Sequence, residues 1–442
     1  MKQISGWGNY PKQLAYEESF DTIQKLSTIL GHGKSQVVRG NARSYGDSAI
    51  GKRAISTLNY NRMLSFDTQK GVIKCEAGVL FSDILEVTVT KGWFLPVTPG
   101  TKFITVGGAI ASDVHGKNHH KEGSFSNHLI AFEILSGDGK IRTCGKDLNR
   151  DLFDATCGGM GLTGIILNAT FKLKPIESAY ITQRQIKAKN LDEIIDLFEK
   201  YESYTYSMAW IDCLKGGKGF GRSILICGEH SKLTELNSRQ RQQPFHFKPK
   251  TKLVIPFNFP SFALNKLSIQ SFNALFYAKN FKKEINSIVP YEPFFYPLDS
   301  ILSWNRMYGK VGFVQYQFVL PKASGKEGLI EILDKIRRKG MGSFLAVLKA
   351  FGKQDDLISF PMEGLTLALD FPIKKGLLEF LDELDSIVLN YNGRIYLTKD
   401  ARMQSEVFKT SYAGFDKWVN IIKKYNPNYQ FASDQSYRLN IT

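Results

Sequence analysis

The order of apolar and polar positions predicts a chain that builds α and β structure twice. The first part opens with an amphipathic helix over 22–30, which ends at the glycine of position 31. Short alternating or apolar runs follow, bounded by turn dipeptides, and such runs are typical of β-strands. We expect a helix within 82–92 and strands within 35–40, 53–58, 71–79, 129–137 and 162–174. This first α+β part extends to about residue 178.

After that point the pattern of helices and strands restarts. Helices are predicted over 190–201, 328–339 and 376–391. Strands are predicted over 206–214, 222–229, 312–321 and 365–373, and the glycine-rich stretch 215–221 predicts a hairpin turn. Residues 236–262 lack clear periodicity, which predicts a long mobile loop. Near the C-terminus we expect one further helix over 405–425.

The composition indicates how many domains the chain can form and in which cellular compartment it resides. A chain of 442 residues with 43% hydrophobic residues is long enough for two packed domains. Its five cysteines form no C-x-x-C pair, which disfavours a disulfide framework or a zinc knuckle and favours a reducing compartment. The stretch 1–20 has no apolar signal core, and no apolar run reaches the length of about 18 residues that spans a membrane. We therefore expect a cytoplasmic protein, with peripheral contact to the inner membrane left open.

The net charge is strongly positive, at +16 from 58 Lys and Arg against 42 Asp and Glu. This balance favours an anionic partner, which can be a phosphate group, an acidic lipid head group or nucleic acid. The lysines are spread along the chain and form no compact basic block interleaved with aromatic residues. Nucleic acid is therefore the least favoured of the three partners.

Two short glycine motifs are incomplete. The stretch GHGKS at 31–35 lacks the first glycine of a phosphate-binding P-loop, because that position is Thr28. A helix C-cap is the better interpretation there. The stretch GGKGFG at 216–221 misses the third glycine of a dinucleotide fingerprint, which again favours a turn. The chain also contains no G-x-S-x-G nucleophile elbow.

Three histidines, His115, His119 and His120, lie within six positions. A helix would bring the first two to one face, but Gly116 and the glycines before it disfavour a helix. No cluster of cysteines or carboxylates lies nearby in the sequence, and the charge of Lys117 would oppose a dication. We therefore expect no metal site at these histidines.

Small residues gather in three segments of the first part. They are RGNARSYGDSA at 39–49, a glycine-rich stretch at 96–124 that includes GGAIAS, and CGGMGLTGII at 157–166. Glycine and alanine let backbone amides approach a ligand closely, and the arginines of the first segment are phosphate donors. Three such segments favour one extended organic cofactor, which would supply the reactivity of a chain with no evident nucleophile or metal.

Together with 304–321, 345–352, 396–400 and 431–439, these segments resemble the FAD-dependent oxidases of the vanillyl-alcohol oxidase superfamily, and within it the decaprenylphosphoryl-β-D-ribose 2-oxidase family. The resemblance covers essentially the whole chain, and VGGAIASDVHGKNHH at 106–120 is its most specific part. It implies a two-domain α+β flavoprotein. A PCMH-type FAD-binding domain of two α+β subdomains would comprise 1–178 plus 394–442. A substrate domain built on a large antiparallel sheet would comprise 179–393.

The resemblance also implies which residues bind FAD. They are Arg39, Gly40, Asn41, Ala42, Arg43, Ser44, Tyr45, Pro99, Gly100, Thr101, Thr105, Gly107, Gly108, Ala109, Ala111, Ser112, His115, Gly116, Asn118, His119, Gly164, Ile165 and Tyr396. In many members of the superfamily a histidine in the first loop bonds covalently to the flavin. That position is Arg43 here, so we expect non-covalent FAD that dissociates when the protein is denatured.

The implied substrate-binding residues are Tyr296, Trp304, Gln315, Gln317, Lys349 and Lys399. Gln315 and Gln317 are two positions apart, so a strand would present both to one face. Lys399, His115 and Tyr396 are the implied catalytic residues. Lys399 has three possible roles: binding the alcohol, accepting its proton, or stabilising negative charge on the reduced flavin. Without the resemblance, Trp304 and Tyr396 can also be core aromatics, and Lys349 a solvated helix lysine.

One departure from the family pattern concerns the strand matched by 364–372. The family carries a reactive cysteine there, where this chain has Ala368. Hydride transfer does not need that thiol, so the implied activity stands. Covalent inhibition through a thiol at this position is excluded.

The implied activity is FAD-dependent oxidation of a sugar secondary alcohol to a ketone. The implied substrate is C2 of a polyprenyl-phosphate-linked ribose, as the first half of a 2-epimerisation to arabinose that a short-chain-type reductase partner would complete. The basic charge and the 236–262 segment suit a phosphate-headed, lipid-tailed substrate at a membrane surface. Two alternatives stay open: a soluble alditol or aldonolactone oxidase, and a non-catalytic flavin-binding protein.

Overall fold

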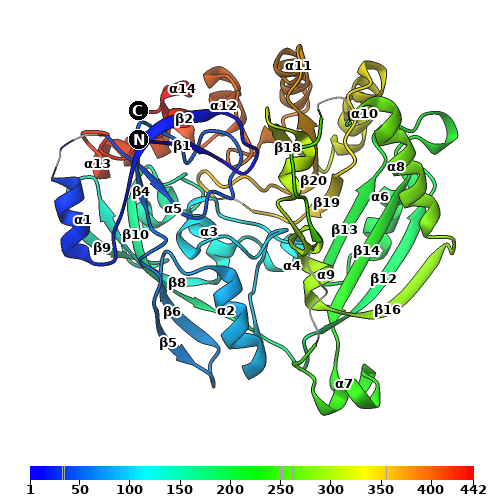
Figure 1. Ribbon diagram of the computed structural model, residues 1–442, viewed down its shortest axis with the longest axis horizontal. Helices are drawn as coiled ribbons and strands as arrows, with labels where there is room; N and C mark the ends of the chain where they lie inside the picture. Colours follow the sequence, from blue (N-terminus) through cyan, green and yellow to red (C-terminus); the bar gives the residue numbers. More distant parts are fainter. Residues whose placement is uncertain (32, 34, 248–252, 261–262, 355) are drawn as a thin grey trace.

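The protein folds as two α+β parts that lie side by side. The computed structural model describes residues 1–31, 33, 35–247, 253–260, 263–354 and 356–442. In Figure 1 the first part runs from blue to cyan and carries the red C-terminal helices, while the second part runs from green to orange. The expected class, α+β with two subdomains in the first part and a large antiparallel sheet in the second, is confirmed.

A small four-stranded sheet forms the N-terminal subdomain. Its order is β1 (Lys2–Ser5), β2 (Lys12–Ser19), β4 (Arg53–Ser56) and β3 (Val37–Arg39). Strands β2 and β3 both run parallel to β4, and helix α1 (Ile23–Leu30) connects β2 to β3. The buried face of α1 packs against Phe20 and Ile55. The predicted C-cap at Gly31 is confirmed, while positions 32 and 34 of the same motif lie outside the described residues.

A five-stranded antiparallel sheet forms the second subdomain. Its order is β5 (Met63–Asp67), β6 (Val72–Glu76), β10 (Gly164–Lys172), β8 (Leu129–Ser136) and β9 (Ile141–Cys144). Its helices are α2 (Phe81–Thr88), α3 (Val106–Ala111), α4 (His119–Glu122) and α5 (Arg150–Thr156). Helix α3 packs on β6 and β10, which brings the glycine-rich segment against the sheet.

The second part is built on an eight-stranded sheet whose neighbours all run antiparallel. Its order is β16 (Glu284–Pro290), β12 (Tyr180–Ala188), β14 (Ser223–His230), β13 (Tyr206–Ile211), β19 (Ala346–Phe351), β20 (Gly364–Pro372), β18 (Phe313–Pro321) and β21 (Arg394–Ile395). The hairpin expected at 215–221 joins β13 to β14. The edge strand β21 comes from the C-terminal segment, so this sheet spans the predicted boundary at residue 394.

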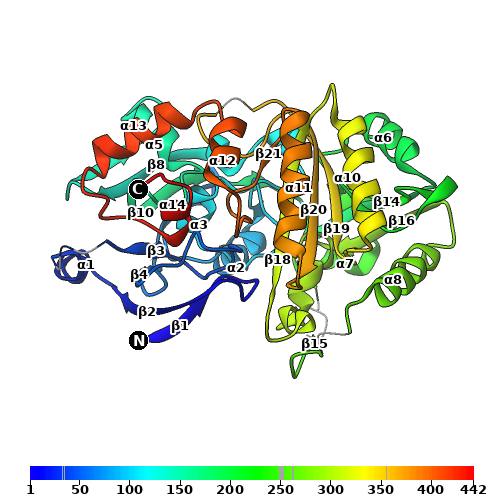
Figure 2. The ribbon, with the colours of Figure 1, turned by 90° about the horizontal axis from the view of Figure 1, so that it is seen from above.

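Three helices cover one face of this sheet, and the middle strands of the other face line a site. The helices are α6 (Leu191–Lys200), α10 (Gly325–Lys339) and α11 (Leu377–Asn390), and α10 and α11 lie over β18 and β20 (Figure 2). Tyr316 of β18 points to the helices, because its hydroxyl donates to Asp385 of α11 at 3.0 Å. Its neighbours Gln315 and Gln317 therefore point to the opposite face.

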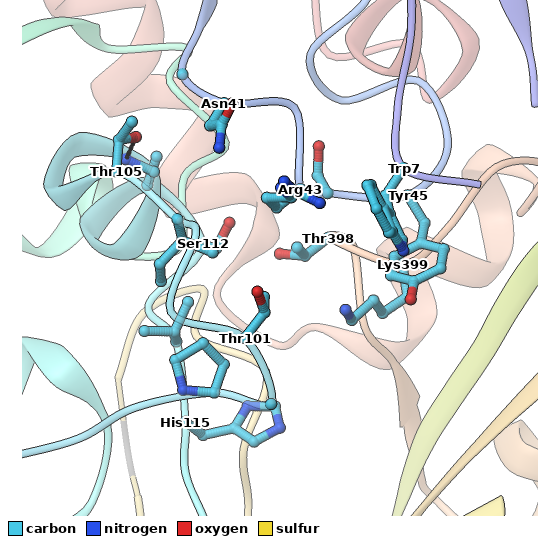
Figure 3. A pocket seen from close by; sticks show the side chains of 18 of the residues that line it. Trp7, Asn41, Arg43, Tyr45, Thr101, Thr105, Ser112, His115, Thr398 and Lys399 are labelled. Atoms are coloured by element: carbon cyan, nitrogen blue, oxygen red, sulfur yellow. Dashed lines mark hydrogen bonds between the residues drawn. The ribbon is translucent and has the colours of Figure 1, made fainter. Parts of the chain in front are cut away.

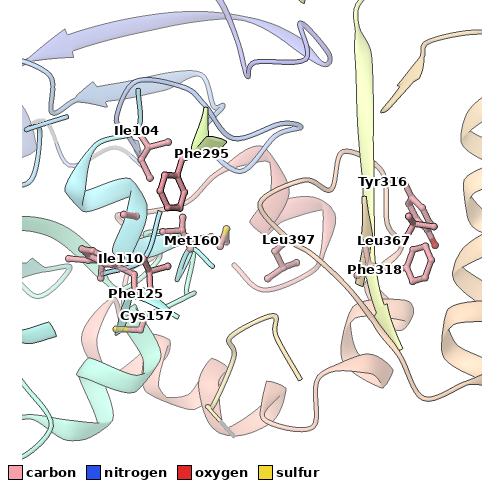
Figure 4. Packing of buried hydrophobic residues seen from close by; sticks show 14 of the residues in the cluster. Ile104, Ile110, Phe125, Cys157, Met160, Phe295, Tyr316, Phe318, Leu367 and Leu397 are labelled. Atoms are coloured by element: carbon pink, nitrogen blue, oxygen red, sulfur yellow. The ribbon is translucent and has the colours of Figure 1, made fainter. Parts of the chain in front are cut away.

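The apolar cores of the two parts are continuous. One buried cluster contains Ile110 and Phe125 of the first part and Tyr316 and Phe318 of the second, with Leu397 between them (Figure 4). Continuous apolar packing fixes how the two parts sit relative to each other. The walls of a site between them are therefore preformed.

The structure corrects three expectations about secondary structure. The 236–262 segment contains the short elements α7 (Ser238–Gln242) and β15 (Leu253–Val254), although its residues 248–252 and 261–262 lie outside the described residues. The helix expected over 405–425 is interrupted before Gly414 and forms α12 (Ser405–Ser411) and α13 (Phe415–Tyr425). A Cβ at Gly414 would lie 2.0 Å from the carbonyl oxygen of Leu357, so this close approach requires glycine. Helix α8 (Lys266–Lys279) has no counterpart among the predicted elements.

The remaining elements are short. They are the pair β7 (Trp93–Phe94) and β11 (Lys174–Pro175), the parallel pair β15 and β17 (Ile301–Leu302), and helices α9 (Tyr291–Phe295) and α14 (Asp434–Arg438). No helix among the described residues is both long enough and apolar enough to cross a membrane.

Candidate functional site

A cavity of about 340 Å³ lies where the two parts meet. One wall comes from the first part and includes the loop after β3, the segment before α3 and the turn at Met160. The opposite wall is the open face of the large sheet. In Figure 3 the side chains of Arg43, Thr101, Thr398 and Lys399 surround a common space, although they come from distant segments of the chain. A concave site of this volume is large enough for a small-molecule ligand.

Most of the residues expected at the cofactor and the substrate line this cavity. From the cofactor set they are Gly40, Asn41, Ala42, Arg43, Ser44, Tyr45, Pro99, Gly100, Thr101, Thr105, Gly107, Gly108, Ala111, Ser112, His115, Gly116, Gly164 and Tyr396. From the substrate set they are Trp304, Gln315, Gln317, Lys349 and Lys399. The fold therefore gathers all three small-residue segments around one space, as expected.

Six expected residues do not line the cavity: Arg39, Ala109, Asn118, His119, Ile165 and Tyr296. The guanidinium of Arg39 is occupied by two backbone carbonyl groups of its own subdomain. Ala109 and Ile165 are fully buried in apolar cores behind the wall. Tyr296 lies one layer deeper than expected, with its hydroxyl 2.8 Å from that of Thr98, which does line the cavity.

The other two residues of this group, Asn118 and His119, also have structural partners. The side-chain amide of Asn118 donates to the carbonyl of Pro96 at 2.7 Å. The Nε2 atom of His119 lies 2.5 Å from Oε1 of Gln354 in the second part, and burial lowers the pKa of His119 to about 4. Both residues hold the cavity loop in place from behind.

Small residues leave room for a ligand to approach the backbone. At Gly100 and Gly161 an added Cβ would meet no atom within 4 Å, so the space beside these two lining residues is open. Two buried nitrogens of the lining, Nε of Arg43 and Nδ1 of His115, have no hydrogen-bond partner among the described residues. An extended ligand with anionic groups would satisfy both. The residues present therefore fit FAD.

Arg43 is held in place before any ligand binds. Its Cζ lies 4.1 Å from the ring centroid of Trp7 and 5.4 Å from that of Phe103. A guanidinium stacked on aromatic rings loses little further freedom when it meets an anion. Arginine does not form the covalent bond that histidine forms in many relatives, so this position suits a dissociable flavin.

Three lysines line the cavity: Lys117 after α3, Lys349 on β19 and Lys399 after β21. The amine of Lys117 donates to the backbone carbonyl of Phe295 at 3.2 Å. Burial lowers the pKa of Lys349 and of Lys399 to about 8. Burial, helped by the charge of Lys349, lowers the pKa of Lys117 to about 7. Both the charged and the neutral amine are accessible near neutral pH, as anion binding and proton exchange require. Because Lys349 lies on a strand that faces the cavity, the alternative of a solvated helix lysine is wrong.

Lys399 is positioned by the C-terminal tail and by an aromatic ring. Its Nζ lies 4.3 Å from the ring centroid of Tyr45. The next residue, Asp400, forms a 2.7 Å ion pair with Arg438 of α14, which also pairs with Asp47 at 2.8 Å. These ion pairs fix the backbone that carries Lys399.

Tyr396 and His115 form the floor of the cavity near Lys399. The hydroxyl of Tyr396 donates to the carbonyl of Ser112 at 3.0 Å, and its ring stacks on Phe360 at 4.5 Å. The His115 ring lies 5.2 Å from that of Tyr396 and 4.8 Å from that of Phe351. Burial and the nearby charge of Lys349 hold the pKa of His115 well below its usual range. The imidazole is therefore neutral at physiological pH.

The paired glutamines belong to a polar row across two strands. In the register of β18 and β20, Gln315 lies opposite Asp370 and Gln317 opposite Ala368. The amide of Gln315 donates to Asp370 at 2.6 Å, and the Tyr308 hydroxyl donates to the same carboxyl group at 3.3 Å. Burial raises the pKa of Asp370 to about 7, while the charge of Lys399 opposes this rise. The predicted single face of Gln315 and Gln317 is confirmed.

Among the residues of this site that sequence reasoning missed are Trp7, Lys117 and Asp370. Lys117 lies inside the histidine segment, where the sequence pattern indicates only a charge that opposes a metal. Asp370 is two positions after Ala368, so the alternation of a strand places both on one face. That spacing could have identified Asp370. The position of Trp7 follows from tertiary packing and left no local pattern.

Metal binding has no support in the part of the chain that the structure describes. No group of three or more His, Cys, Asp or Glu residues there is arranged to hold an ion. His115, His119 and His120 have Gln317, Gln354 and a backbone carbonyl as partners of their Nε2 atoms.

Comparison with known proteins agrees with this geometry. Residues 11–145 match the family model of the FAD binding domain. The chain is 38% identical to decaprenylphosphoryl-β-D-ribose oxidase of Mycolicibacterium smegmatis over 455 aligned positions, which cover 100% of this chain and 98% of that protein. It is 30% identical to an uncharacterised protein of Streptomyces coelicolor over 81% of this chain and 99% of the relative. It is 27% identical to a D-lactate dehydrogenase of Anaerostipes hadrus over 42% of this chain and 41% of that enzyme.

A relationship of this strength over the full length, combined with a preformed cavity that fits FAD, assigns the chain to a class of enzyme. The protein is an FAD-dependent oxidoreductase that belongs to the decaprenylphosphoryl-β-D-ribose oxidase family.

Proposed function

We propose that this enzyme oxidises the C2 hydroxyl of a polyprenyl-phosphate-linked ribose to a ketone. The observation that carries the proposal is the meeting of Lys117, Lys349 and Lys399 with Gln315 and Gln317 around one cavity. Ammonium groups suit a phosphate, and amides suit sugar hydroxyls. The relative from Mycolicibacterium smegmatis is named for oxidation of decaprenylphosphoryl ribose, which supports the same substrate class here.

The first part holds the cofactor in this proposal. Arg43 and Ser44, which line the cavity, would hold the pyrophosphate, and the wall of Gly107, Gly108 and Ser112 would lie along the rest of the cofactor. When bound, FAD supplies the acceptor for the hydride that leaves the carbinol carbon. We infer the corresponding domain division of 1–178 plus 394–442 for FAD and 179–393 for the substrate.

Lys399 handles the hydroxyl proton in this mechanism. With its pKa lowered to about 8, a substantial fraction of Nζ is neutral near physiological pH and can accept the proton of the 2-hydroxyl group. Asp370 lies close enough to stabilise the ammonium that forms. Nδ1–H of His115 donates a hydrogen bond that orients the substrate, and the hydroxyl of Tyr396, donated to Ser112, fixes the floor.

Substrate selection follows from charge and from hydrogen bonding. Lys117 and Lys349 attract the phosphate, and its negative charge raises their pKa values so that both amines become fully charged. Gln315 and Gln317 bind sugar hydroxyls from the face of β18. The ketone product would then be consumed by a reductase of the short-chain type, which completes the epimerisation to arabinose.

Rapid anaerobic mixing tests this proposal. The purified flavoprotein is mixed with a short-chain polyprenylphosphoryl ribose, and the loss of flavin absorbance is followed. We expect bleaching much faster than with free alditols or aldonolactones. Faster bleaching by the free sugars would support a soluble-sugar oxidase, and no bleaching by either class would support a non-catalytic flavoprotein.

A further inference from the structure

A long segment without acidic residues carries more than half of the excess positive charge. Residues 236–283 contain neither Asp nor Glu. Their basic residues are Arg239, Arg241, Lys248, Lys250, Lys252, Lys266, Lys279, Lys282 and Lys283. These nine positive charges compare with a net +16 for the whole chain. No acidic residue within the segment offsets these charges, although Lys283 pairs with Glu193 outside it at 3.3 Å.

The same segment exposes large apolar side chains. Between residues 253 and 281 they are Leu253, Val254, Phe257, Leu267, Leu275 and Phe281. Phe272 and Phe276 are exposed in part, but their rings also pack on Phe344 and Trp210. Leu267 and Leu275 of α8 are 73% and 72% exposed, and Phe281 is 81% exposed. Isolated apolar residues on a surface are ordinary, but a group this dense marks a surface that contacts something else.

Helix α8 is attached to the protein along one narrow line. Ile269 and Asn273, four residues apart, are its buried residues. The amide of Asn273 donates to Asp212 at 2.9 Å, and the hydroxyl of Tyr277 donates to the carbonyl of Ala188 at 3.2 Å. This line of contacts holds the helix firmly while its leucines stay in solvent.

The exposed apolar residues of 253–281 are also linked to the wall of the cavity through a strand pair. Strand β15 pairs with β17, and β17 directly follows Pro297, Leu298 and Asp299, which line the cavity. In Figure 2, β15 lies at the bottom of the view and α8 lies to its right. Phe272 of α8 packs on Phe344, whose neighbour Leu345 lines the cavity. The apolar and basic surface is therefore close to the site that would receive a lipid-tailed substrate.

We propose that this surface docks the enzyme on an anionic lipid bilayer. The docking face comprises Leu253, Val254, Phe257, Leu267, Leu275 and Phe281 with Lys266, Lys279, Lys282 and Lys283. Leucine and phenylalanine side chains enter the boundary between head groups and acyl chains, and lysines beside them contact acidic head groups. The inference rests in part on the proposed lipid-linked substrate, because such a substrate resides in a membrane.

Flotation of the FAD-loaded protein with vesicles tests the docking face. Phosphatidylcholine vesicles are compared with vesicles that contain about 30% phosphatidylglycerol, the anionic component that lysines recognise. We expect binding to the anionic vesicles that weakens as salt is raised. The double variant Leu267→Glu/Leu275→Glu should lower the partition coefficient by about tenfold or more, because it removes two leucines from the apolar contact. Lys279→Gln/Lys282→Gln should lower it by about fivefold for each lysine.

The control exchanges exposed leucines outside the segment. Leu64 and Leu148 are 46% and 53% exposed, so Leu64→Glu/Leu148→Glu makes the same chemical change elsewhere. This control should bind vesicles as the unaltered protein does. Equal flavin content in all variants shows that each one is folded.

Four results would overturn the proposal. The first is that the unaltered protein does not bind anionic vesicles, and the second is that the α8 variant and its control bind them equally. The third is salt-sensitive binding to DNA without binding to vesicles. The fourth is self-association through α8 without binding to vesicles. Flavin bleaching by a water-soluble short-chain substrate, measured without vesicles, reports separately on the proposed catalytic function. The docking proposal can therefore fail while the catalytic proposal holds, and the catalytic proposal can fail while the docking proposal holds.

Discussion

Gln317 of the large sheet meets His115 of the first part across the cavity, with the amide Nε2 3.1 Å from the imidazole Nε2. Because the amide donates, the histidine Nε2 accepts, and the neutral ring carries its proton on Nδ1. The lowered pKa of His115 agrees with this neutral form. Nδ1 has no hydrogen-bond partner among the described residues. The contact thus prepares a donor for the substrate.

His115→Phe should therefore weaken catalysis without removing the flavin. The change keeps an aromatic ring against Phe351 and Tyr396 but removes the Nδ1–H donor. We expect kcat/KM for the lipid-linked ribose to fall about tenfold, the value of one hydrogen bond in a buried site. His246→Phe, at an exposed histidine, is the matched control. Unchanged kcat/KM in His115→Phe would remove His115 from the mechanism.

Lys399→Ala should abolish most of the substrate-dependent flavin reduction. Loss of a positioned proton acceptor costs about 100-fold or more in rate. The visible spectrum of the bound flavin should persist, because the glycine-rich walls are intact. Lys322→Ala removes a lysine outside the cavity and should leave the rate unchanged. If Lys399→Ala reduces its flavin at the normal rate, the proton belongs to another group.

The pH dependence of flavin reduction follows from the pKa values of Lys399 and Asp370. Neutral Lys399 is the acceptor, so the rate should rise as pH passes through about 8. The carboxylate of Asp370 raises the pKa of Lys399, and Asp370→Asn should therefore move this rise to lower pH. Asp416→Asn, at an exposed carboxylate, should not move it. A shift to higher pH in Asp370→Asn would contradict the proposed coupling.

Denaturation in acid should release the flavin. Arg43 stands where many members of the superfamily carry the histidine that binds FAD covalently, and its guanidinium is stacked over Trp7. We expect the yellow colour in the supernatant after precipitation with trichloroacetic acid. Arg43→Ala should also lower the affinity of the folded protein for FAD, measured as flavin lost during dialysis. Colour retained in the pellet would refute non-covalent binding.

Much of this architecture is predictable from the sequence because its cause is local. The alternation of apolar and polar residues predicts β18 and β20. The same alternation places Gln315 and Gln317 on one face of β18. The small-residue segments line the cavity because only small side chains leave room for a ligand beside the backbone. Turn and cap chemistry likewise identified the helix end at Gly31.

Other features depend on distant packing. Gly414 interrupts the predicted helix because the carbonyl of Leu357, far away in the sequence, approaches it closely. The sequence pattern did not predict helix α8, because its apolar residues lie all around the helix axis and form no single stripe. The helix buries only Ile269 and the polar residue Asn273. Trp7 and Asp299 line the cavity because of tertiary packing, and the local sequence around each of them does not indicate that position.

Isotopic substitution of the substrate tests whether the C2–H bond of the ribose breaks when the flavin is reduced. Flavin bleaching is followed anaerobically with polyprenylphosphoryl ribose that carries deuterium at C2, and again with deuterium at C3. Breakage of the C2–H bond in the oxidation predicts slower bleaching with the C2-deuterated substrate and an unchanged rate with the other. Slowing by deuterium at C3 alone, or no bleaching by the lipid-linked ribose at all, would contradict the proposed oxidation.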